Sequence, residues 1–465
     1  MEQGIPKRAL MRVRFAPSPT GFLHLGGLRT ALFNYLLARK QPEGKFILRI
    51  EDTDRTRIVP SAIESLQKTL RWAGIDYDEG PDKPGNYGPY VQSQRLNIYK
   101  EYSNEIIESG RAYRCFCSKE RLDLVKGING KYDGHCSGMN INESKSRVMN
   151  NEPFIIRFKT PSEGPKELIT DEVFGVIKPT QLDDVVLMKS DGFPTYHFAN
   201  IIDDHLMKID LVMRGAEWIP STPLHNLLYE AFGWNKPRFA HLPLLINQDG
   251  SKLSKRQDSA HVSHYINTGI LPSALNNFVA FLGWTPKGTN EEVFDMKELI
   301  EKFDLKGLNN SDATVNFDKL KWLNRQHLKL NSYNPELIKN LRNLVKDHLT
   351  TTNFDENYLE QVIKVSVDRI FFIKDIIELC PYYFIDPYYD TLEAIDLLNK
   401  IKPKDIDLAL SQGSFTDVKT PSLLRLIMTG CKIGPPIHET IKVLGEEFCQ
   451  KRFDNFKTWK NNQLP

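Results

Sequence analysis

Near its N-terminus the chain places a strand pattern, a tight loop and a helix pattern in direct succession, and this order constrains the fold more than any other feature. Residues 12–16 have the pattern of a short strand, and prolines and glycines crowd the segment 17–27. A second strand at 46–50 and a second helix at 61–72, placed after Pro60, repeat the order. The alternation predicts a parallel sheet with crossover helices. Apolar residues of the first helix recur at helical spacing, at Leu28, Ala31, Leu32, Tyr35 and Leu36.

The pattern changes twice further along the chain. Between 113 and 190, strand patterns at 154–158 and 185–188 lie among polar, turn-rich stretches, which indicates an inserted α+β module. The strand–helix alternation resumes at 195–200, with a strand at 211–213, a helix at 221–232 and a strand at 242–246. After about residue 330 the chain becomes helical, with amphipathic segments at 337–345, 361–379 and 423–428. We therefore predict an α/β fold with a parallel sheet, an α+β insertion and an all-α C-terminal region, divided into 10–112, 113–190, 191–257, 258–330 and 331–465.

The composition is that of a soluble globular protein. Its 465 residues exceed one ordinary core, so two to four domains are expected. Apolar residues make up 40% and charged residues 26%, and no run approaches the roughly 20 apolar residues that a membrane span needs. The net charge of +2 neither requires nor excludes nucleic acid. Six cysteines favour a reducing compartment over a disulfide framework, and residues 1–11 resemble neither a secretory signal nor a strong transit peptide.

The loop before the first helix contains Gly21, His24, Gly26 and Gly27. A helix that begins at about Gly27 presents backbone N–H groups and a partial positive charge, which together attract anions. Glycines let a nucleotide approach the backbone closely, and His24 can donate to a phosphate oxygen. Taken alone, the motif also fits a loop histidine beside an ordinary helix cap.

A second motif, residues 250–256, contains Lys252, Lys255 and Arg256. A glycine-containing loop that bears lysines suits phosphate charge that develops during a reaction, because lysine is a flexible point charge. Taken alone, this motif also fits a solvated basic loop. The two motifs together, in this order in one chain, are far more specific than either, and they indicate the use of ATP.

The two motifs resemble the signatures of a known enzyme class. His24-Leu25-Gly26-Gly27 resembles the HIGH signature of class I aminoacyl-tRNA synthetases, and the segment 252–256 resembles their KMSKS loop. The short motifs at 14–21, 49–54, 192–197 and 203–205 resemble those of bacterial-type glutamyl-tRNA synthetases. The segment 423–445 is similar to the last helices of that family. The segments 22–30 and 250–257 resemble the mitochondrial members most.

The resemblance implies an activation step in which the glutamate carboxylate attacks the α-phosphate of ATP. Positioning and charge stabilisation then carry the reaction, with no covalent nucleophile. Glu51 would hold the ammonium group, and Arg214 would meet the side-chain carboxylate with its planar fork and so reject glutamine. Matched by position, the catalytic residues are His24, Lys252 and Lys255, the ATP-binding residues are His24, Gly26, Gly27, Glu217 and Lys255, and the glutamate-binding residues are Arg14, Ala16, Ser18, Glu51, Tyr196, Asn200 and Arg214.

Some of these residues also fit roles in the structure alone. Tyr196 and Ala16 suit core positions, Glu51 suits a solvated turn, and Arg214 suits a surface cation after an apolar strand.

The resemblance also implies the partners and the role of each segment. The segments 10–112 and 191–257 would form a Rossmann-like catalytic domain, 113–190 an acceptor-binding module, 258–330 a helical region that contacts the tRNA stem, and 331–465 the anticodon-binding region. Acidic residues slightly outnumber basic ones in this last segment, so its tRNA role rests on the resemblance. We expect a monomer that uses ATP and Mg²⁺, L-glutamate and tRNA(Glu), with tRNA(Gln) left open, in the mitochondrial matrix by resemblance or, alternatively, in the cytoplasm.

Three cysteines of the insertion lie where some bacterial relatives bind structural zinc through Cys-x-Cys and Cys-x-His. Cys115, Cys117 and Cys136 are present, but the fourth position is Gly138, and His135 and Tyr132 are the nearest candidates. Structural zinc normally takes four nitrogen or sulfur ligands. We therefore expect small apolar cysteines here rather than a structural zinc site.

Two other functions fit the same motifs. A nucleotidyltransferase of the same fold, or the shortened paralogue that glutamylates a modified base, would lack the long helical C-terminal region. A catalytically inactive homologue that only binds tRNA would not need intact phosphate motifs, Glu51 and Arg214, all of which are present.

Overall fold

The computed structural model describes residues 11–162, 167–178, 182–253, 261–349 and 354–462. The chain divides into two compact units, unit 1 with Met1–Tyr265 and Asn276–Asn316, and unit 2 with Ile266–Leu275 and Phe317–Pro465. Within the described ranges, no helix combines the length and the apolar character needed to cross a membrane.

A six-stranded sheet forms the centre of unit 1, in the order β2-β1-β8-β9-β5-β6. Its first five strands are parallel, and β6 runs antiparallel to β5 at one edge. The strands are β2 (Lys45–Leu48), β1 (Arg12–Phe15), β8 (Leu211–Gly215), β9 (Arg238–Leu242), β5 (Ile169–Asp171) and β6 (Gly175–Ile177). The predicted parallel sheet is therefore confirmed.

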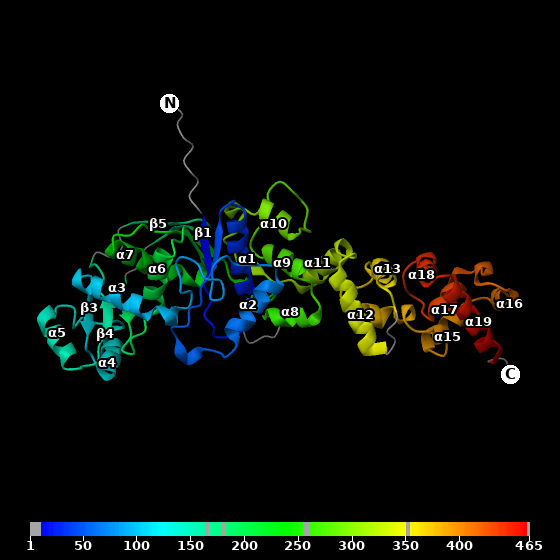
Figure 1. Cartoon of the computed structure of the whole chain (residues 1–465), viewed down its shortest axis with the longest axis horizontal. Coiled ribbons are helices and arrows are strands. Elements are labelled where there is room, and N and C mark those ends of the chain that lie inside the picture. Colours follow the sequence, from blue (N-terminus) through cyan, green and yellow to red (C-terminus); the bar gives the residue numbers. More distant parts are fainter. Residues whose placement is uncertain (1–10, 163–166, 179–181, 254–260, 350–353, 463–465) are drawn as a thin grey trace, which may run out of the picture. The chain divides into compact units, whose positions relative to one another are not determined.

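Helix α1 (Leu25–Arg39) makes the crossover from β1 to β2 (Figure 1). Its Leu28, Ala31, Leu32 and Phe33 are fully buried, because a crossover helix in an α/β fold packs against the sheet. Further helices of this part are α2 (Ala62–Trp72), α6 (Tyr196–Leu206) and α7 (Thr222–Ala231).

The segment 113–190 contributes to two sheets. Strands β3 (Ala112–Cys115), β4 (Ile155–Phe158) and β7 (Val186–Met188) form an antiparallel sheet of their own. The hairpin β5/β6 instead joins the central sheet beside β9. Helices α3 (Leu96–Glu108), α4 (Lys119–Asn129) and α5 (Ile141–Met149) accompany the smaller sheet (Figure 1).

The strand predicted at 242–246 is two short strands instead of one. β9 ends at Leu242, and β10 (Leu245–Ile246) pairs in parallel with β11 (Ala313–Thr314). Pro243 lies between them and has no N–H to donate to a ladder, so the strand cannot continue through it. Helices α8 (Val262–Thr268), α9 (Pro272–Ala280) and α10 (Met296–Lys302) follow.

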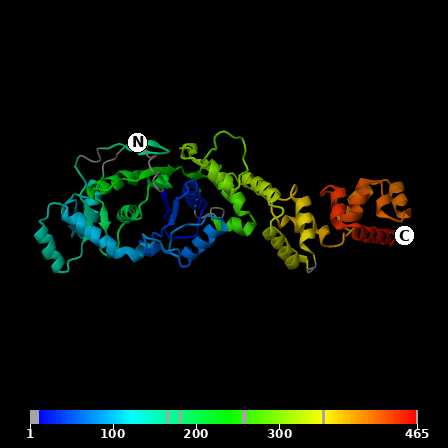
Figure 2. The same ribbon diagram turned by 45° about the horizontal axis from the view of Figure 1, so that its top comes forward.

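Unit 2 is helical, as predicted (Figure 2). Its core includes Leu341, Leu359, Ile376 and Phe456. The predicted segment 361–379 is broken in two, because one helix ends at Ser366 and the next begins at Asp375. Between them the Asp375 carboxylate accepts from the backbone N–H groups of 371 and 372 at 2.8 and 2.9 Å. The helices are α11 (Phe317–Leu330), α12 (Pro335–Leu349), α13 (Glu356–Ser366), α14 (Asp375–Leu379), α15 (Leu392–Asn399), α16 (Pro403–Ser411), α17 (Pro421–Thr429), α18 (Ile437–Leu444) and α19 (Glu446–Asn462).

Candidate active site

His24 is the N-cap of α1. Its Nδ1 accepts the backbone N–H of Gly27 at 3.1 Å, which satisfies one of the open donors of the first helical turn. Because a neutral imidazole carries one proton, this bond places the proton on Nε2, the form that donates to a phosphate oxygen. The helix begins at Leu25 rather than at about Gly27, so both glycines lie inside its first turn.

The two glycines of this turn occupy crowded positions. A Cβ at Gly26 would lie 3.2 Å from the His24 ring, and a Cβ at Gly27 would lie 2.8 Å from Leu23 Cδ1. A side chain at Gly26 would press on the ring of the capping His24, and one at Gly27 would displace the side chain of Leu23. The turn therefore combines close backbone approach with the positive end of a helix, which suits a phosphate.

Lys252 is exposed next to β10, where it forms a bridge with Ile246. The N–H of Leu253 donates to the carbonyl of Leu245 at 3.0 Å. The second predicted lysine, Lys255, lies outside the described residues.

The chain that follows the second motif returns to the first. His261 forms an antiparallel bridge with His24, and the Val262 N–H donates to the Leu23 carbonyl at 2.9 Å. Residues that lie far apart in the sequence are thus adjacent at the start of α1.

A buried ion-pair network lies between β1, the segment after β2, and α6. Arg14 meets Asp204 with two hydrogen bonds, of 3.0 Å and 3.2 Å, and Arg49 donates to the same carboxylate at 2.7 Å. Burial opposes ionisation of Asp204, but the two arginines hold its pKa below the ordinary value. Arg14 therefore has a carboxylate partner within the protein and is fixed in one orientation.

Glu51 joins this network through one oxygen. Its Oε1 accepts from Arg49 Nη2 at 3.1 Å and from Asn200 Nδ2 at 3.0 Å. Burial raises the pKa of Glu51, against the lowering effect of Arg49 and Arg14. No hydrogen bond from another described residue reaches Oε2, so an ammonium group would both satisfy this oxygen and favour the charged form.

Asp203, next to Asp204 in the chain, holds a second group of buried side chains in the same region. Its carboxylate accepts from Arg95 at 2.7 Å, from Gln92 at 2.9 Å and from the hydroxyl of Tyr99 at 2.9 Å. The sequence prediction gave no role to Asp203, Asp204 or Arg49. The signal was present in two adjacent acids on a mostly apolar helix, because buried charges in proteins are normally paired.

Arg214, at the end of β8, is buried among neutral groups. Its guanidinium donates to the imidazoles of His241 and His225, to the hydroxyls of Tyr196 and Thr222, and to the carbonyl of residue 218, all between 3.1 and 3.3 Å. No carboxylate among the described residues pairs with it. A buried cation without a counter-ion is costly, so this position favours a ligand that brings a negative charge.

The predicted glutamate-binding residues Arg14, Glu51, Tyr196, Asn200 and Arg214 are brought together. The charges of Arg214, Glu51 and Arg14 all act on the pKa of the Tyr196 phenol. Asn200 donates a hydrogen bond to Glu51. Cationic, anionic and neutral side chains therefore lie in one cluster of contacting groups, as the binding of an amino acid with a charged side chain requires.

The remaining predicted residues lie nearer the surface. Ala16 is partly exposed and Ser18 is exposed on the loop before α1, and this loop is tied to the site because the N–H of Glu51 donates to the carbonyl of Pro17 at 3.0 Å. Glu217 is exposed on the 3-10 helix η3 (Ala216–Ser221).

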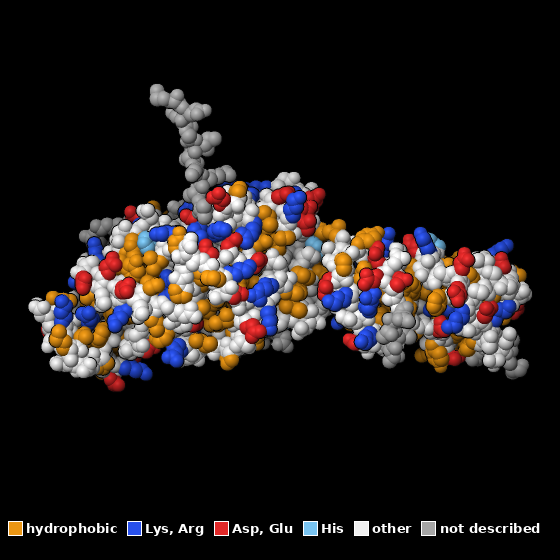
Figure 3. All heavy atoms as spheres, in the orientation of Figure 1, with side chains coloured by type: hydrophobic (Ala, Val, Ile, Leu, Met, Phe, Trp, Pro, Cys, Tyr) orange, Lys and Arg blue, Asp and Glu red, His pale blue; other side chains and the backbone are white. Residues whose placement is uncertain are grey.

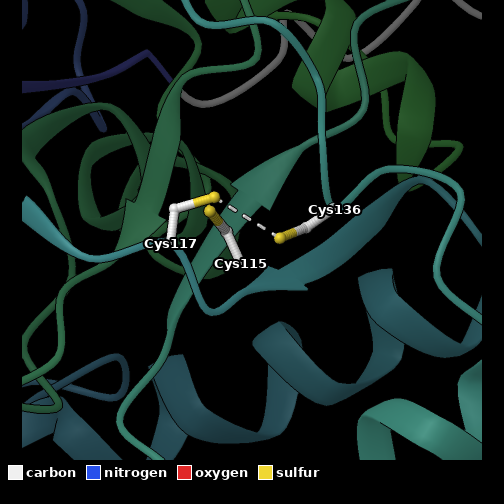
Figure 4. Close-up of side chains that lie close together, drawn as sticks. All are labelled: Cys115, Cys117 and Cys136. Carbon is white, nitrogen blue, oxygen red and sulfur yellow. Dashed lines mark hydrogen bonds between the residues drawn. The ribbon is translucent and has the colours of Figure 1, made fainter. Parts of the chain in front are cut away.

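The cysteines of the segment 113–190 form a cluster (Figure 4). The sulfur atoms of Cys115, Cys117 and Cys136 all lie within 4.8 Å of one another. The hydroxyl of Tyr132 lies 3.3 Å from Cys115 Sγ and 3.6 Å from Cys117 Sγ. Three sulfurs and the hydroxyl oxygen of Tyr132 thus lie close together.

The surroundings of this cluster favour the deprotonated form of one thiol, that of Cys115, but not that of Cys117. Burial opposes ionisation of Cys115, but the Tyr132 hydroxyl and Arg157 lower its pKa, whereas burial raises the pKa of Cys117 to about 11. Arg121 Nη1 lies 3.5 Å from Cys117 Sγ. Sulfur must be deprotonated to bind a metal, and a metal ion itself supplies that driving force.

The described surface of unit 2 carries basic and acidic side chains interspersed, as the face in Figure 3 shows. Charge alone therefore does not mark a nucleic-acid interface there.

Known proteins resemble this chain over nearly its whole length. A family model described as tRNA synthetases class I (E and Q), catalytic domain, matches residues 10–322. A glutamate–tRNA ligase of Chloroherpeton thalassium is 41% identical over 96% of this chain and 97% of its own. One of Finegoldia magna is 42% identical over 94% of this chain and 97% of its own.

A solved structure agrees in fold. The crystal structure of a glutamate tRNA ligase from Elizabethkingia meningosepticum, in complex with its amino acid, superposes with a TM-score of 0.85 and 34% identity, covering 96% of this chain and 99% of that one. The chain therefore belongs to the class I glutamyl- and glutaminyl-tRNA synthetase family, beside the bacterial glutamate–tRNA ligases.

Proposed function

We propose that this protein attaches L-glutamate to the 3′ end of tRNA(Glu), using ATP and releasing AMP and diphosphate. The observation that carries the proposal is Arg214, whose buried guanidinium is surrounded by neutral groups and so selects a carboxylate side chain. The relatives named above, which are glutamate–tRNA ligases, support it.

In the first step, an oxygen of the glutamate α-carboxylate forms a bond to the α-phosphorus of ATP, and the bond from that phosphorus to diphosphate breaks. Glu51 Oε2 holds the ammonium group, and Arg214 holds the side-chain carboxylate. Both ends of the amino acid are then fixed, which aligns the attacking oxygen. In the second step, a hydroxyl of the terminal tRNA ribose attacks the carbonyl carbon, and AMP leaves.

The start of α1 binds the phosphates in this scheme. His24 donates from Nε2, while Gly26 and Gly27 allow close approach to the helix N-terminus. Lys252 and Lys255 neutralise the charge on diphosphate as it leaves. Glu217 contacts ATP, and Ala16 and Ser18 border the amino acid. Mg²⁺ arrives with ATP and offsets phosphate charge.

The test is aminoacylation by the purified chain with ATP, Mg²⁺, radiolabelled L-glutamate and purified tRNA(Glu) or tRNA(Gln). Charging of tRNA(Glu) is expected, and failure to charge any tRNA with glutamate would refute the proposal. Charging of tRNA(Gln) as well would show a non-discriminating enzyme. Each assay contains tRNA, because bacterial-type members resemble one another in needing tRNA before they activate glutamate.

The helical unit 2 favours this ligase over a nucleotidyltransferase or the shortened paralogue, both of which lack such a region. Within it, 331–465 would contact the anticodon and 258–330 the stem, while 113–190 would contact the acceptor end. We propose that the enzyme acts as a monomer. The relatives named above are bacterial, which favours the cytoplasmic location over the mitochondrial matrix.

We further propose that Cys115, Cys117, Cys136 and Tyr132 hold one structural zinc ion. Zinc–sulfur bonds of about 2.3 Å in a tetrahedron separate the sulfurs by roughly 3.8 Å. Cys117 Sγ and Cys136 Sγ already lie 3.6 Å apart. The sequence prediction of ordinary apolar cysteines lacked a fourth ligand, and the position of Tyr132 removes that objection.

A further inference from the structure

Two buried imidazoles hold the guanidinium of Arg214. Arg214 Nε donates to His241 Nε2 at 3.1 Å, and its Nη1 donates to His225 Nδ1 at 3.1 Å. A guanidinium has donors only, so both of these imidazole nitrogens must accept. Each histidine is therefore required in one tautomer, and both are buried, at 0% and 1% exposure.

The tautomer of His241 is fixed by a carboxylate. With Nε2 accepting, the ring proton is on Nδ1, which donates to Asp171 Oδ2 at 2.7 Å. The other oxygen of Asp171 accepts from the backbone N–H groups of Val173 and Phe174, both at 2.9 Å. This carboxylate is thus anchored at the end of β5, and its contact to His241 reaches across the pairing of β5 with β9.

The tautomer of His225 is fixed by a second histidine. With Nδ1 accepting, its proton is on Nε2, which donates to His197 Nδ1 at 3.1 Å. His197 follows Tyr196, whose hydroxyl also accepts from Arg214. Burial and the charge of Arg214 lower the pKa of both His225 and His197, so these rings stay neutral beside the cation.

The uncharged state of the two imidazoles that bind Arg214 affects which substrate the site selects. Arg14 is held by a carboxylate, that of Asp204, but Arg214 is held by uncharged rings. Hydrogen bonds join Arg214 to His225 and, through His241, to Asp171, and we call these two histidines and Asp171 the relay. Its one carboxylate, Asp171, contacts His241 and acts on Arg214 through that ring. The guanidinium is thereby oriented without being neutralised, and its charge remains for the substrate.

We propose that Asp171, His241 and His225 are positioning residues that set the selectivity of this site for a carboxylate over a carboxamide side chain. The proposal rests on the function proposed above and adds the residues that make Arg214 selective. In it, the segment 113–190 takes part in amino-acid selection through Asp171, besides any contact with tRNA.

The test replaces one atom of the relay. In Asp171→Asn the amide nitrogen can donate to His241 Nδ1, which moves the ring proton to Nε2 and aims it at the Arg214 N–H. Two donors then face each other and Arg214 turns away. The KM for L-glutamate should rise about 10-fold or more, while the KM values for ATP and tRNA stay within about twofold. Competitive inhibition by L-glutamine should not weaken in parallel.

Asp184→Asn is the matched control. Asp184 is another carboxylate of the segment 113–190, and it accepts from the Tyr113 hydroxyl at 2.5 Å and from the Thr160 N–H at 2.9 Å, outside the relay. Its glutamate KM should equal that of the wild type. A wild-type glutamate KM in Asp171→Asn, or an equal rise of all three KM values in both variants, would overturn the proposal.

A second pair of variants covers the case in which Asp171→Asn does not fold. His225→Asn keeps an acceptor near the Nδ1 position and His225→Phe removes it. A raised glutamate KM in His225→Phe that His225→Asn largely restores is expected, and equal KM values in the two would count against the relay. If the wild type charges no tRNA with glutamate, both proposals fall, whereas wild-type charging with unaltered variants refutes the relay alone.

Discussion

At the scale of single residues, the site contains buried arginines with opposite surroundings. Arg14 pairs with the carboxylate of Asp204, and Arg49 pairs with Asp204 and Glu51, so both arginines have carboxylate partners inside the protein. Arg214 meets only neutral acceptors among the described residues. The position of counter-ions, more than the presence of arginine, therefore distinguishes these cations, and Arg214 is the one whose charge no carboxylate among the described residues offsets.

Arg214→Lys is expected to lower kcat/KM for L-glutamate about 10- to 100-fold, because an ammonium cannot reproduce the planar fork that meets a carboxylate and its five protein acceptors. Steady-state aminoacylation measures it. Arg238→Lys, at an exposed arginine of the neighbouring strand, serves as the control and should behave as the wild type. Unchanged kcat/KM in Arg214→Lys would contradict the assigned role.

His24 combines a structural bond and a chemical one, and variants can separate them. His24→Ala removes the cap of α1, which costs about 1 kcal/mol of unfolding free energy, and also removes the phosphate donor. His24→Asn keeps a capping oxygen but loses the Nε2 proton. Chemical unfolding should show near wild-type stability for His24→Asn, while its kcat falls about 100-fold. Wild-type turnover in His24→Asn would exclude a phosphate contact by this ring.

At the scale of elements, α6 positions much of the candidate site. Tyr196 and Asn200, which bond Arg214 and Glu51, lie about one turn apart. Asp203 and Asp204 lie one turn further on and accept from Arg95 and Arg14. This spacing puts them on neighbouring faces of one helix. The same helix carries the buried His197, so we expect the unfolding free energy of the protein to depend on pH.

His197 predicts the direction of that dependence. Burial, with the charge of Arg214, lowers its pKa to about 4 from an ordinary 6.5. The unfolded chain then binds the proton more tightly than the folded one, so stability is complete above pH 6.5 and falls as the pH drops towards 4. The shift corresponds to about 3 kcal/mol. Unfolding free energy measured across this range should slope less in His197→Asn, whereas His264→Asn, at an exposed histidine, should keep the wild-type slope.

The cysteine cluster makes the element β3 and the loop after it sensitive to metal. Atomic absorption of the purified protein should find about one zinc per chain, and chelation should lower the thermal stability of this region. Cys117→Ser should lose the metal, and Tyr132→Phe should bind it more weakly. Cys431→Ser, in unit 2, should retain it. A metal-free wild type purified with zinc present would show that the cluster consists of ordinary thiols.

At the scale of the whole molecule, the sequence predicted what depends on local pattern. The parallel strands β1, β2 and β8, the helix α1 and the helical unit 2 follow from periodicity, proline and glycine. The grouping of Arg14, Glu51 and Arg214 followed from resemblance to a family. These are features that each segment encodes for itself.

Contacts between distant segments escaped the sequence prediction. The strands β5 and β6 are three residues long and have no pattern of their own, so only their pairing with β9 defines them. His225 and His241 carry no sequence signal that separates them from other histidines, and the sequence prediction named Tyr132 only as one of two candidates beside the cysteines. Their roles arise from tertiary geometry, which overrides local signals.

The pairing of β5 with β9 bears on how such enzymes can be recombined. A chimera that exchanges 113–190 as a block would also replace Asp171. Under the role proposed above for Asp171, a piece that lacks aspartate at this position would change amino-acid choice even when it was selected for its fit to another tRNA. Recombination boundaries placed outside 169–177, so that the recipient keeps its own hairpin, would allow the two specificities to be varied separately.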